Sequence, residues 1–164
     1  MSDTYDFILN LRVIRDYEPD PLSTEDLEAI LQAGRMTGSS KNRQGWSFVA
    51  VTDPDRLRGL AEHGDFTQPV RDSAATVVLV QEEGGHMFDM GRAAQNMMLA
   101  SKAIGVASCP ITLHRDGDAR EYMGAPSETI VRYAIALGYP TADAKPARMG
   151  GRKSAKSVIK YDLY

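Results

Sequence analysis

Thr76-Val77-Val78-Leu79-Val80 is an uninterrupted run of apolar and β-branched residues. β-Branched side chains favour strands, and a strand without polar alternation is covered on both of its faces. This segment therefore predicts the central strand of a sheet that has packing layers on either side. The segments before and after it must supply the other strands and those layers.

Upstream of this strand, Ser47-Phe48-Val49-Ala50-Val51 predicts a second strand, and Asp53-Pro54 is typical of a helix start. Nearer the amino terminus two helices are expected. Asp3 or Thr4 caps the first, whose apolar face carries Phe7, Ile8 and Leu11; Ser23 or Thr24 caps the second, which ends near Gly34.

Downstream, residues 87–104 predict a long helix that is apolar on nearly all sides and ends at Gly105. Such a helix must be central in the fold or lie in a subunit interface. We expect a strand or extended segment over 107–113, a short helix over 118–123 and a strand over 129–137. Because strict βαβ alternation is missing, these elements predict an α+β domain with helices packed on a mostly antiparallel or mixed sheet.

Length and composition bound the class of protein. The chain has 164 residues, 43% of them hydrophobic, which fits one globular domain spanning 1–164. No run of about 18 apolar residues is present, so no membrane span is expected. The acidic amino terminus is unlike a signal peptide, and a single cysteine, Cys109, fits a reducing compartment. We expect a cytoplasmic protein.

Charge is unevenly distributed along the chain. Residues 145–164 carry six Lys or Arg and one Asp, hence +5, which leaves −8 for the rest of a chain whose net charge is −3. An acidic body argues against duplex nucleic acid as a partner. The basic tail, which includes Arg148, could contact a partner subunit, bind a phosphate group, or be a solvated terminus.

Several kinds of catalytic site find no support in the residue pattern. His63, His86 and His114 are far apart and none has a partner at metal-ligand spacing, so no metal site is predicted. There is no G-x-S-x-G elbow, no P-loop and no G-x-G-x-x-G fingerprint. Cys109 could be a nucleophile, but a lone cysteine on an apolar strand is usually a small buried hydrophobe. If the protein is an enzyme, a bound cofactor carries its chemistry.

Two polar segments are not explained by packing. Leu11-Arg12-Val13-Ile14-Arg15-Asp16-Tyr17 places two arginines three residues apart, and residues 37–46 form a loop rich in hydroxyls, amides and glycines that leads into a strand. These groups suit hydrogen bonding to a polar heterocycle as well as to solvent. The alternatives are a generic surface loop and surface pairs between the arginines and nearby acids.

Together these segments resemble the nitroreductase family of flavoproteins, and the resemblance covers nearly the whole chain in order. The family's R-R-S-x-R-x-F/Y motif is similar to residues 11–17, and its A-P-S-x-x-N-x-Q-P-W loop is similar to 37–46, where Ser39, Asn42, Gln44 and Trp46 match. The central helix resembles residues 90–106. A strand ending in Gly138-Tyr139-Pro140 and a basic element at Gly151-Arg152-Lys153 complete the series.

The resemblance implies a nitroreductase-like α+β fold and an intertwined homodimer in which residues 150–164 form an arm on the partner protomer. It also implies FMN, with its phosphate on the first arginine motif and the basic tail, its ring along 110–113, and the S-x-x-N loop supplied by one subunit. The implied cofactor-binding residues are Leu11, Arg12, Val13, Arg15, Ser39, Ser40, Asn42, Gln44, Pro110, Ile111, Thr112, Leu113, Arg152 and Lys153.

Three departures from the family pattern bear on this site. Leu11 and Val13 replace an arginine and a serine of the first motif, so Arg12, Arg15, Arg152 and Lys153 must supply the charge for a phosphate. Gly45 replaces the proline that precedes Trp46. The chain is also short for the family, so we expect an open or small site.

The resemblance implies an FMN-dependent oxidoreductase that uses NADH or NADPH as its diffusible reductant. Its expected acceptor is an electron-poor small molecule such as a nitroaromatic, quinone or enone. No side chain is required as a catalytic acid or base, because FMN carries the hydride chemistry. Two alternatives remain: a flavin-binding storage or sensor protein without NAD(P)H turnover, and a dimer without a cofactor.

Overall fold

The computed structural model describes residues 2–146 and 150–164, in which four strands form one antiparallel sheet. The strands are β1 (Trp46–Val51), β2 (Ala75–Gln81), β3 (Ala107–Thr112) and β4 (Ile130–Gly138), in the order β1-β2-β4-β3. All neighbouring pairs are antiparallel. The α+β prediction is therefore confirmed, and each predicted strand is present.

Strand β2 is central, as its apolar run predicts. Six of its seven residues are buried, and it pairs with β1 on one side and β4 on the other. Val77 and Leu79 point into one apolar cluster, while Val78 and Val80 point into a second cluster on the opposite face. Burial on both faces explains why this segment has no polar alternation.

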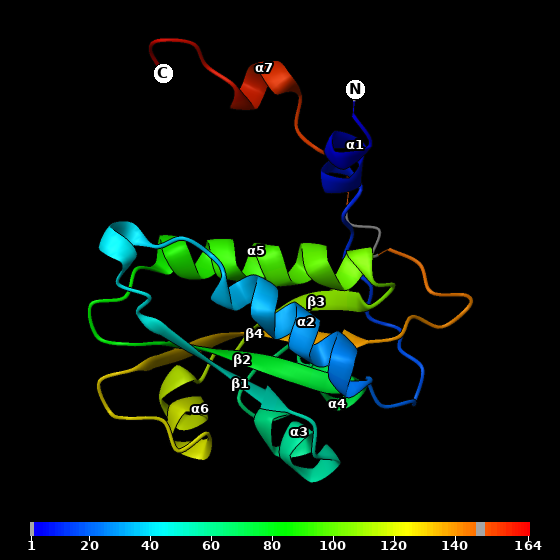
Figure 1. Ribbon diagram of the computed structural model, residues 1–164, viewed down its shortest axis with the longest axis vertical. Coiled ribbons are helices and arrows are strands. Elements are labelled where there is room, and N and C mark those ends of the chain that lie inside the picture. Colours follow the sequence, from blue (N-terminus) through cyan, green and yellow to red (C-terminus); the bar gives the residue numbers. More distant parts are fainter. Residues whose placement is uncertain (1, 147–149) are drawn as a thin grey trace.

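The helices form a layer on each face of the sheet (Figure 1). Helices α2 (Thr24–Arg35) and α5 (Met87–Ala103) cover one face, and α3 (Pro54–Ala61), α4 (Gln68–Arg71) and α6 (Asp116–Tyr122) cover the other. α2 packs closely on α5, because a Cβ added at Gly34 would lie 2.0 Å from Cε of Met97. One face of α5 is buried through Met90, Met97 and Met98, so the methionines are core residues as expected.

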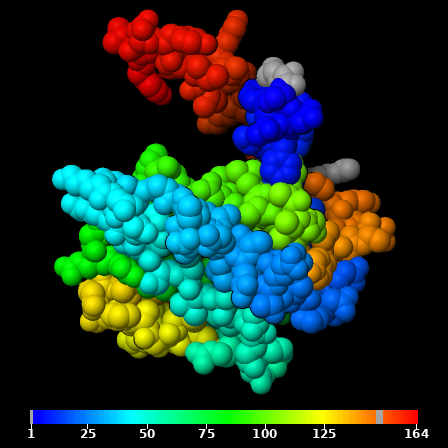
Figure 2. Space-filling view, in the orientation of Figure 1, coloured from blue at the N-terminus to red at the C-terminus, as the bar shows by residue number. Residues whose placement is uncertain are grey.

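The two ends of the chain extend beyond this three-layered body (Figures 1 and 2), and α1 touches α5 where Nζ of Lys102 donates to the carbonyl of Phe7 at 2.7 Å. Neither α1 (Asp3–Leu9) nor α7 (Ala155–Val158) contains a buried residue. Both segments nevertheless expose large apolar side chains, among them Ile8, Leu9, Val158, Ile159, Tyr161 and Leu163. Exposed apolar side chains gathered on segments of this kind are typical of an association surface.

Some predicted boundaries are wrong. Ser2, rather than Asp3 or Thr4, caps α1, and Leu11 lies beyond the end of that helix. Helix α6 begins two residues earlier than predicted. The sequence analysis did not foresee α4, α7 or the short 3-10 helix η1 (Ser40–Asn42), each no longer than four residues. Arg148 of the basic tail lies outside the described residues.

Two capping predictions are confirmed. The Ser23 hydroxyl accepts a hydrogen bond from the amide of Asp26 at 3.0 Å, and Asp53 caps α3 by accepting one from the amide of Arg56 at 2.9 Å. No helix within 2–146 or 150–164 is long and apolar enough to cross a membrane.

Candidate functional site

A basic pocket lies between the segment that follows α1, helix α5 and the C-terminal arm. Its volume is about 690 Å³. The first segment contributes Leu11, Arg12, Val13 and Arg15, and the arm contributes Arg152. Five predicted cofactor-binding residues, drawn from opposite ends of the chain, therefore line one hollow. Lys153, the sixth predicted residue of this group, is exposed and does not line it.

The electrostatics of this pocket favour an anion. Within the described residues, neither Arg12 nor Arg15 forms an ion pair with a carboxylate, so the surface pairs considered above do not form. Nη1 of Arg12 donates to the carbonyls of Leu9 and Leu11, both at 2.7 Å, which fixes the guanidinium at the end of α1. Guanidinium groups offer paired donors that match phosphate oxygens.

A second, apolar trough lies along α5. It has a volume of about 400 Å³ and lies between α5 and the edge of the sheet, where it is lined by Met90, Gly91 and Ala94 of α5 and by Pro110 and Thr112 of β3. Gln95 and Met98, on the next turn of α5, line the basic pocket. Positions three and four apart share one helix face, so a single face of α5 forms the wall of both hollows.

Gly91 keeps this wall flat. A Cβ added at Gly91 would find no atom within 4 Å, although glycine inside a helix costs about 1 kcal/mol relative to alanine. Packing against the described residues therefore does not require a glycine at position 91. The glycine leaves room for a flat group against α5.

The open edge of β3 forms the floor of the trough. The carbonyl of Ser108 accepts a hydrogen bond from the amide of Ile14 at 3.3 Å, on the side away from β4, whereas the amide of Leu113 donates to Arg132 of β4 at 2.8 Å. Because backbone groups alternate along a strand, the amide of Thr112 faces the open edge. Pro110, which has no amide hydrogen, occupies a position typical of proline in an edge strand. Leu113 itself is fully buried.

The predicted S-x-x-N loop lies elsewhere, at the amino-terminal end of α5. The amide of Ser40 donates to Oδ2 of Asp89 at 2.9 Å, and the hydroxyl of Ser39 accepts from the amide of Gln44 at 2.8 Å. Asp89 and Met98, which lines the basic pocket, are nine residues apart, or about 14 Å along the helix. One protomer therefore does not bring this loop and the basic pocket together.

The loop is ordered but strained. Lys41, Asn42 and Gln44 have φ angles of 53°, 54° and 51°, in the left-handed region that residues with a side chain rarely adopt. Several such residues in one short loop are typical of functional segments whose surroundings hold them in place. Asp89, only 6% exposed, and Arg92, which donates to the carbonyl of Gly38 at 2.9 Å, provide that support.

Gly45 departs from the family's proline for a steric reason. A Cβ at this position would lie 2.6 Å from Cα of Gly85, and the carbonyl of Gly45 accepts a hydrogen bond from the amide of Glu82 at 3.2 Å. The backbone of the loop thus packs directly on the turn after β2. Trp46 then enters β1 and stacks against Phe48, with ring centroids 6.2 Å apart.

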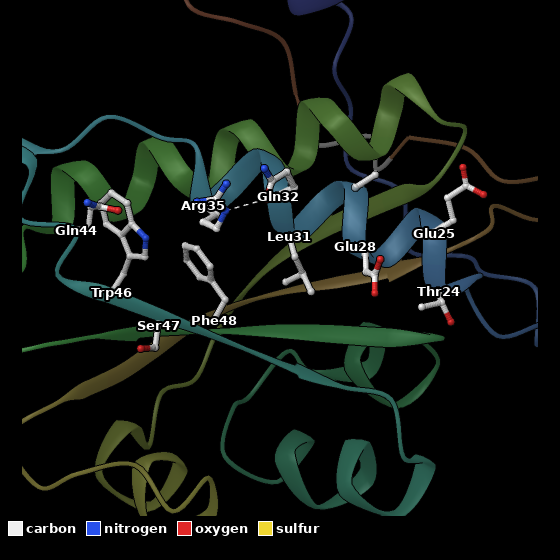
Figure 3. Close-up of a pocket in the computed structure, with 11 residues that line it drawn as sticks. Thr24, Glu25, Glu28, Leu31, Gln32, Arg35, Gln44, Trp46, Ser47 and Phe48 are labelled. Atoms are coloured by element: carbon white, nitrogen blue, oxygen red, sulfur yellow. Dashed lines mark hydrogen bonds between the residues drawn. The ribbon is translucent and has the colours of Figure 1, made fainter.

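Gln44 lines a third hollow, a groove between α2 and the open edge of β1 (Figure 3). Its volume is about 1110 Å³. Leu31, Trp46 and Phe48 project into it from the two elements, while Glu28 and other polar side chains of α2 line its rim. The groove is thus amphipathic and separate from the basic pocket.

Cys109 and Tyr17 are structural rather than reactive. Cys109 is 2% exposed, and burial raises the pKa of its thiol although Arg15 partly opposes this. Burial also raises the pKa of the Tyr17 hydroxyl, which donates to the carbonyl of Ile14 at 3.1 Å. A thiol that stays protonated is a poor nucleophile, so Cys109 has the buried apolar role expected of it.

Several site residues were not identified from the sequence. Gln95 and Met98 were assigned to an apolar helix, and the supporting role of Asp89 was not foreseen. The available signal was the position of Gly91 inside that helix, where a glycine weakens the helix and so indicates a packing or functional reason.

Comparison with known proteins gives the family. The model described as "Nitroreductase family" matches residues 8–83 and 63–139, so the chain belongs to the nitroreductase family. An Archaeoglobus fulgidus protein with the provisional name NADH dehydrogenase/NAD(P)H nitroreductase is 29% identical over 151 residues, which cover 85% of this chain and 87% of the relative.

Two solved structures show the same fold. Nitroreductase A from Vibrio parahaemolyticus has a TM-score of 0.90 and 27% identity, covering 100% of this chain and 78% of that chain. The NADPH:FMN oxidoreductase from Vibrio harveyi, in complex with NAD+, has a TM-score of 0.88 and 26% identity, covering 99% and 78%. The predicted family and nitroreductase-like fold are thus confirmed.

Proposed function

We propose that this protein is an FMN-dependent oxidoreductase that passes reducing equivalents from NADH or NADPH to an electron-poor small molecule. Its expected acceptors are a nitroaromatic, quinone or enone. The observation that carries the proposal is that one face of α5 lines both the basic pocket and the apolar trough. Relatives named for FMN and NADPH, such as the Vibrio harveyi enzyme, support it.

The residues of the two hollows fit the two ends of FMN. Arg12, Arg15 and Arg152 would hold the phosphate by charge-assisted hydrogen bonds. Leu11 and Val13 line the same pocket without a polar group, so the arginines supply the recognition there. This set of cationic donors suits the phosphate of FMN, whereas the apolar trough suits its planar ring system.

The apolar trough suits a planar ring. Gly91 and Ala94 leave the wall of α5 flat, and Pro110 with Thr112 supplies the edge of β3. The free amide of Thr112 would orient the ring by donating a hydrogen bond to its polar edge. Ile111 would contribute packing, whereas Leu113 would support the strand from the core.

When bound, FMN supplies the redox chemistry, taking a hydride equivalent from the nicotinamide and delivering electrons to the acceptor. The protein's own contribution is positional: the arginines anchor one end, the trough excludes water from one ring face, and the Thr112 amide sets the orientation. No side chain of the trough needs to act as acid or base, because solvent can supply protons.

A second protomer would complete the site. We infer that Ser39, Ser40, Asn42 and Gln44 serve the partner's cofactor, because in one protomer they lie at the far end of α5 from the basic pocket. Lys153, which is exposed and outside the basic pocket, would add only general positive charge near the phosphate. Formation of a homodimer is the simplest way to bring all of the predicted residues together.

The arm at 150–164 would pack on that partner. Its exposed apolar residues need a cover, and the groove beside the open edge of β1 presents Leu31, Trp46 and Phe48. The rim of the groove carries Glu25 and Glu28, and the arm carries Lys153, Lys156 and Lys160, so their charges are complementary. An exposed strand edge is also a ready site for adding an extended segment.

The proposal is tested by purifying the protein and identifying its chromophore. We expect a yellow protein that releases FMN on denaturation and whose 450-nm absorbance bleaches on anaerobic addition of NADH or NADPH. Return of the colour on adding a quinone would complete the cycle. A colourless protein that fails to take up FMN would refute the cofactor, whereas retained FMN without bleaching would favour the storage or sensor alternative.

A further inference from the structure

Phe66 is the most exposed phenylalanine in the described residues, at 82%. It lies in the loop between α3 and α4. Single exposed apolar side chains are common on protein surfaces. Phe66 differs in that several hydrogen bonds hold the loop that carries it in place.

Arg115 holds this loop by several hydrogen bonds. Its guanidinium donates to the carbonyl of Glu62 at 2.6 Å, to the carbonyl of Gly64 at 2.9 Å and to Oδ1 of Asp65 at 2.7 Å. The hydrogen bond from Arg115 holds the pKa of the Asp65 carboxyl below its usual range.

Residues on both sides of Phe66 add to this support. The amide of Asp65 donates to Nδ1 of His114 at 3.1 Å. The hydroxyl of Thr67, 3% exposed, donates to the carbonyl of Ala61 at 2.6 Å. The backbone before and after Phe66 is thus fixed, while its ring is left in solvent.

The loop borders the end of the proposed ring site. A Cβ at Gly64 would lie 2.8 Å from the carbonyl oxygen of Thr112, so the loop backbone packs directly against the last residue of β3. The Phe66 ring meets the His114 ring edge-on, with centroids 6.2 Å apart and planes at 70°. Phe66 and His114 therefore form an aromatic pair near the end of β3, just outside the lining of the apolar trough.

We propose that Phe66, supported by His114, is the binding surface for the aromatic ring of the electron acceptor. This inference rests on the proposed function, because the acceptor must lie beside the cofactor to receive electrons. A rigidly presented ring offers a planar acceptor an offset-stacked partner at little entropic cost. The overall reaction is balanced, since NADH and one proton from solvent convert a quinone to its quinol and leave NAD+.

The test compares Phe66→Leu, which keeps apolar bulk without a ring, with Phe66→Tyr, which keeps the ring. The primary readout is equilibrium binding of 2-methyl-1,4-naphthoquinone to the oxidised FMN-loaded protein, followed by flavin fluorescence. Steady-state reduction of the same quinone and of ferricyanide, a non-aromatic acceptor, provides the second readout. FMN affinity and thermal midpoint are measured for each variant.

Aromatic pairs contribute enough to predict a three- to tenfold effect of losing the ring. We expect Phe66→Leu to weaken naphthoquinone binding and raise its KM by about that factor, with ferricyanide reduction, FMN affinity and thermal midpoint unchanged. Phe66→Tyr, which keeps the ring, should bind naphthoquinone as tightly as the wild type does. This combination would support the acceptor site.

Two outcomes would overturn it: wild-type naphthoquinone binding in Phe66→Leu, or a loss that extends equally to ferricyanide and FMN. Failure of the proposed function has a different signature, because a wild-type holoprotein that NADH does not reduce would still report naphthoquinone binding. In that case, wild-type naphthoquinone affinity in Phe66→Leu would refute the aromatic surface. A loss of affinity in Phe66→Leu that is absent in Phe66→Tyr would support it.

Discussion

Replacing Arg152 by alanine tests the proposed phosphate site most directly. Arg152 lies on the arm, far in sequence from Arg12 and Arg15, and lines the same pocket as these two arginines. Nη1 of Arg12 already donates hydrogen bonds to the carbonyls of Leu9 and Leu11, so fewer of its N–H groups remain for a phosphate. With Leu11 and Val13 in place of polar residues, we therefore expect phosphate binding to depend strongly on Arg152.

The expected magnitude follows from the kind of contact. A hydrogen bond to a charged group contributes about 1.5–3 kcal/mol, and about 1.4 kcal/mol corresponds to a tenfold change in affinity. We therefore expect Arg152→Ala to weaken FMN binding by about tenfold to a hundredfold. Riboflavin has the same ring system without a phosphate, so its affinity should hardly change.

The assay is a fluorescence titration of both flavins into apoprotein of the wild type and the variant. Lys153→Ala is the matched control, because it removes an equal charge from the neighbouring position without removing a residue that lines the pocket. We expect FMN affinity to fall less in Lys153→Ala than in Arg152→Ala.

Equal losses for FMN and riboflavin would refute the reasoning, since they would mean that Arg152 supports the fold or the dimer rather than the phosphate. An equal FMN loss in Lys153→Ala would also contradict it, because general attraction by the basic arm would then explain the effect.

Three further predictions concern the arm and the core. Removal of residues 154–164, which retains Arg152, should convert the expected dimer to monomer in light scattering at micromolar concentration, and an unchanged dimer would contradict the docking of the arm. Gly34→Ala places a methyl group against Met97 in the α2–α5 contact, which costs about 1–3 kcal/mol against about 1 kcal/mol gained in helix propensity. Urea denaturation should therefore show a net loss of up to about 2 kcal/mol, and a stabilised variant would contradict that packing. Burial raises the pKa of Cys109 and of Tyr17, so their contribution to stability is full below about pH 8 and falls as pH rises through about 8.5–10, where the unfolded groups ionise. Urea midpoints at pH 7, 9 and 10 should fall accordingly, and Cys109→Ala should flatten the first part of the decline.

Local sequence predicted the framework because its causes act over a few residues. The apolar run 76–80 required cover on both faces, and β2 is buried on both faces. Ser23 and Asp53 begin helices because their side chains accept from amides three residues ahead. The short elements α4 and α7 were missed because four residues carry too little periodicity to identify a helix.

The motif order within the chain also predicted the family, but not how the site is assembled. The family match confirmed that resemblance. Whether Arg12 and Arg152 share one pocket depends on packing between segments some 140 residues apart, which no local pattern specifies. The same holds for the flat wall at Gly91, which becomes meaningful only once β3 lies opposite α5.

Tertiary structure decided the remaining features through contacts between distant residues. Gly45 is required because it meets the backbone of Gly85, and the S-x-x-N loop is held by Asp89, 49 residues after Ser40. Arg115 fixes the loop that presents Phe66 from about 50 residues further along the chain. Sequence patterns report the preferences of neighbouring residues, whereas these contacts arise only when the sheet has closed and brought distant backbone and side-chain groups within hydrogen-bonding distance.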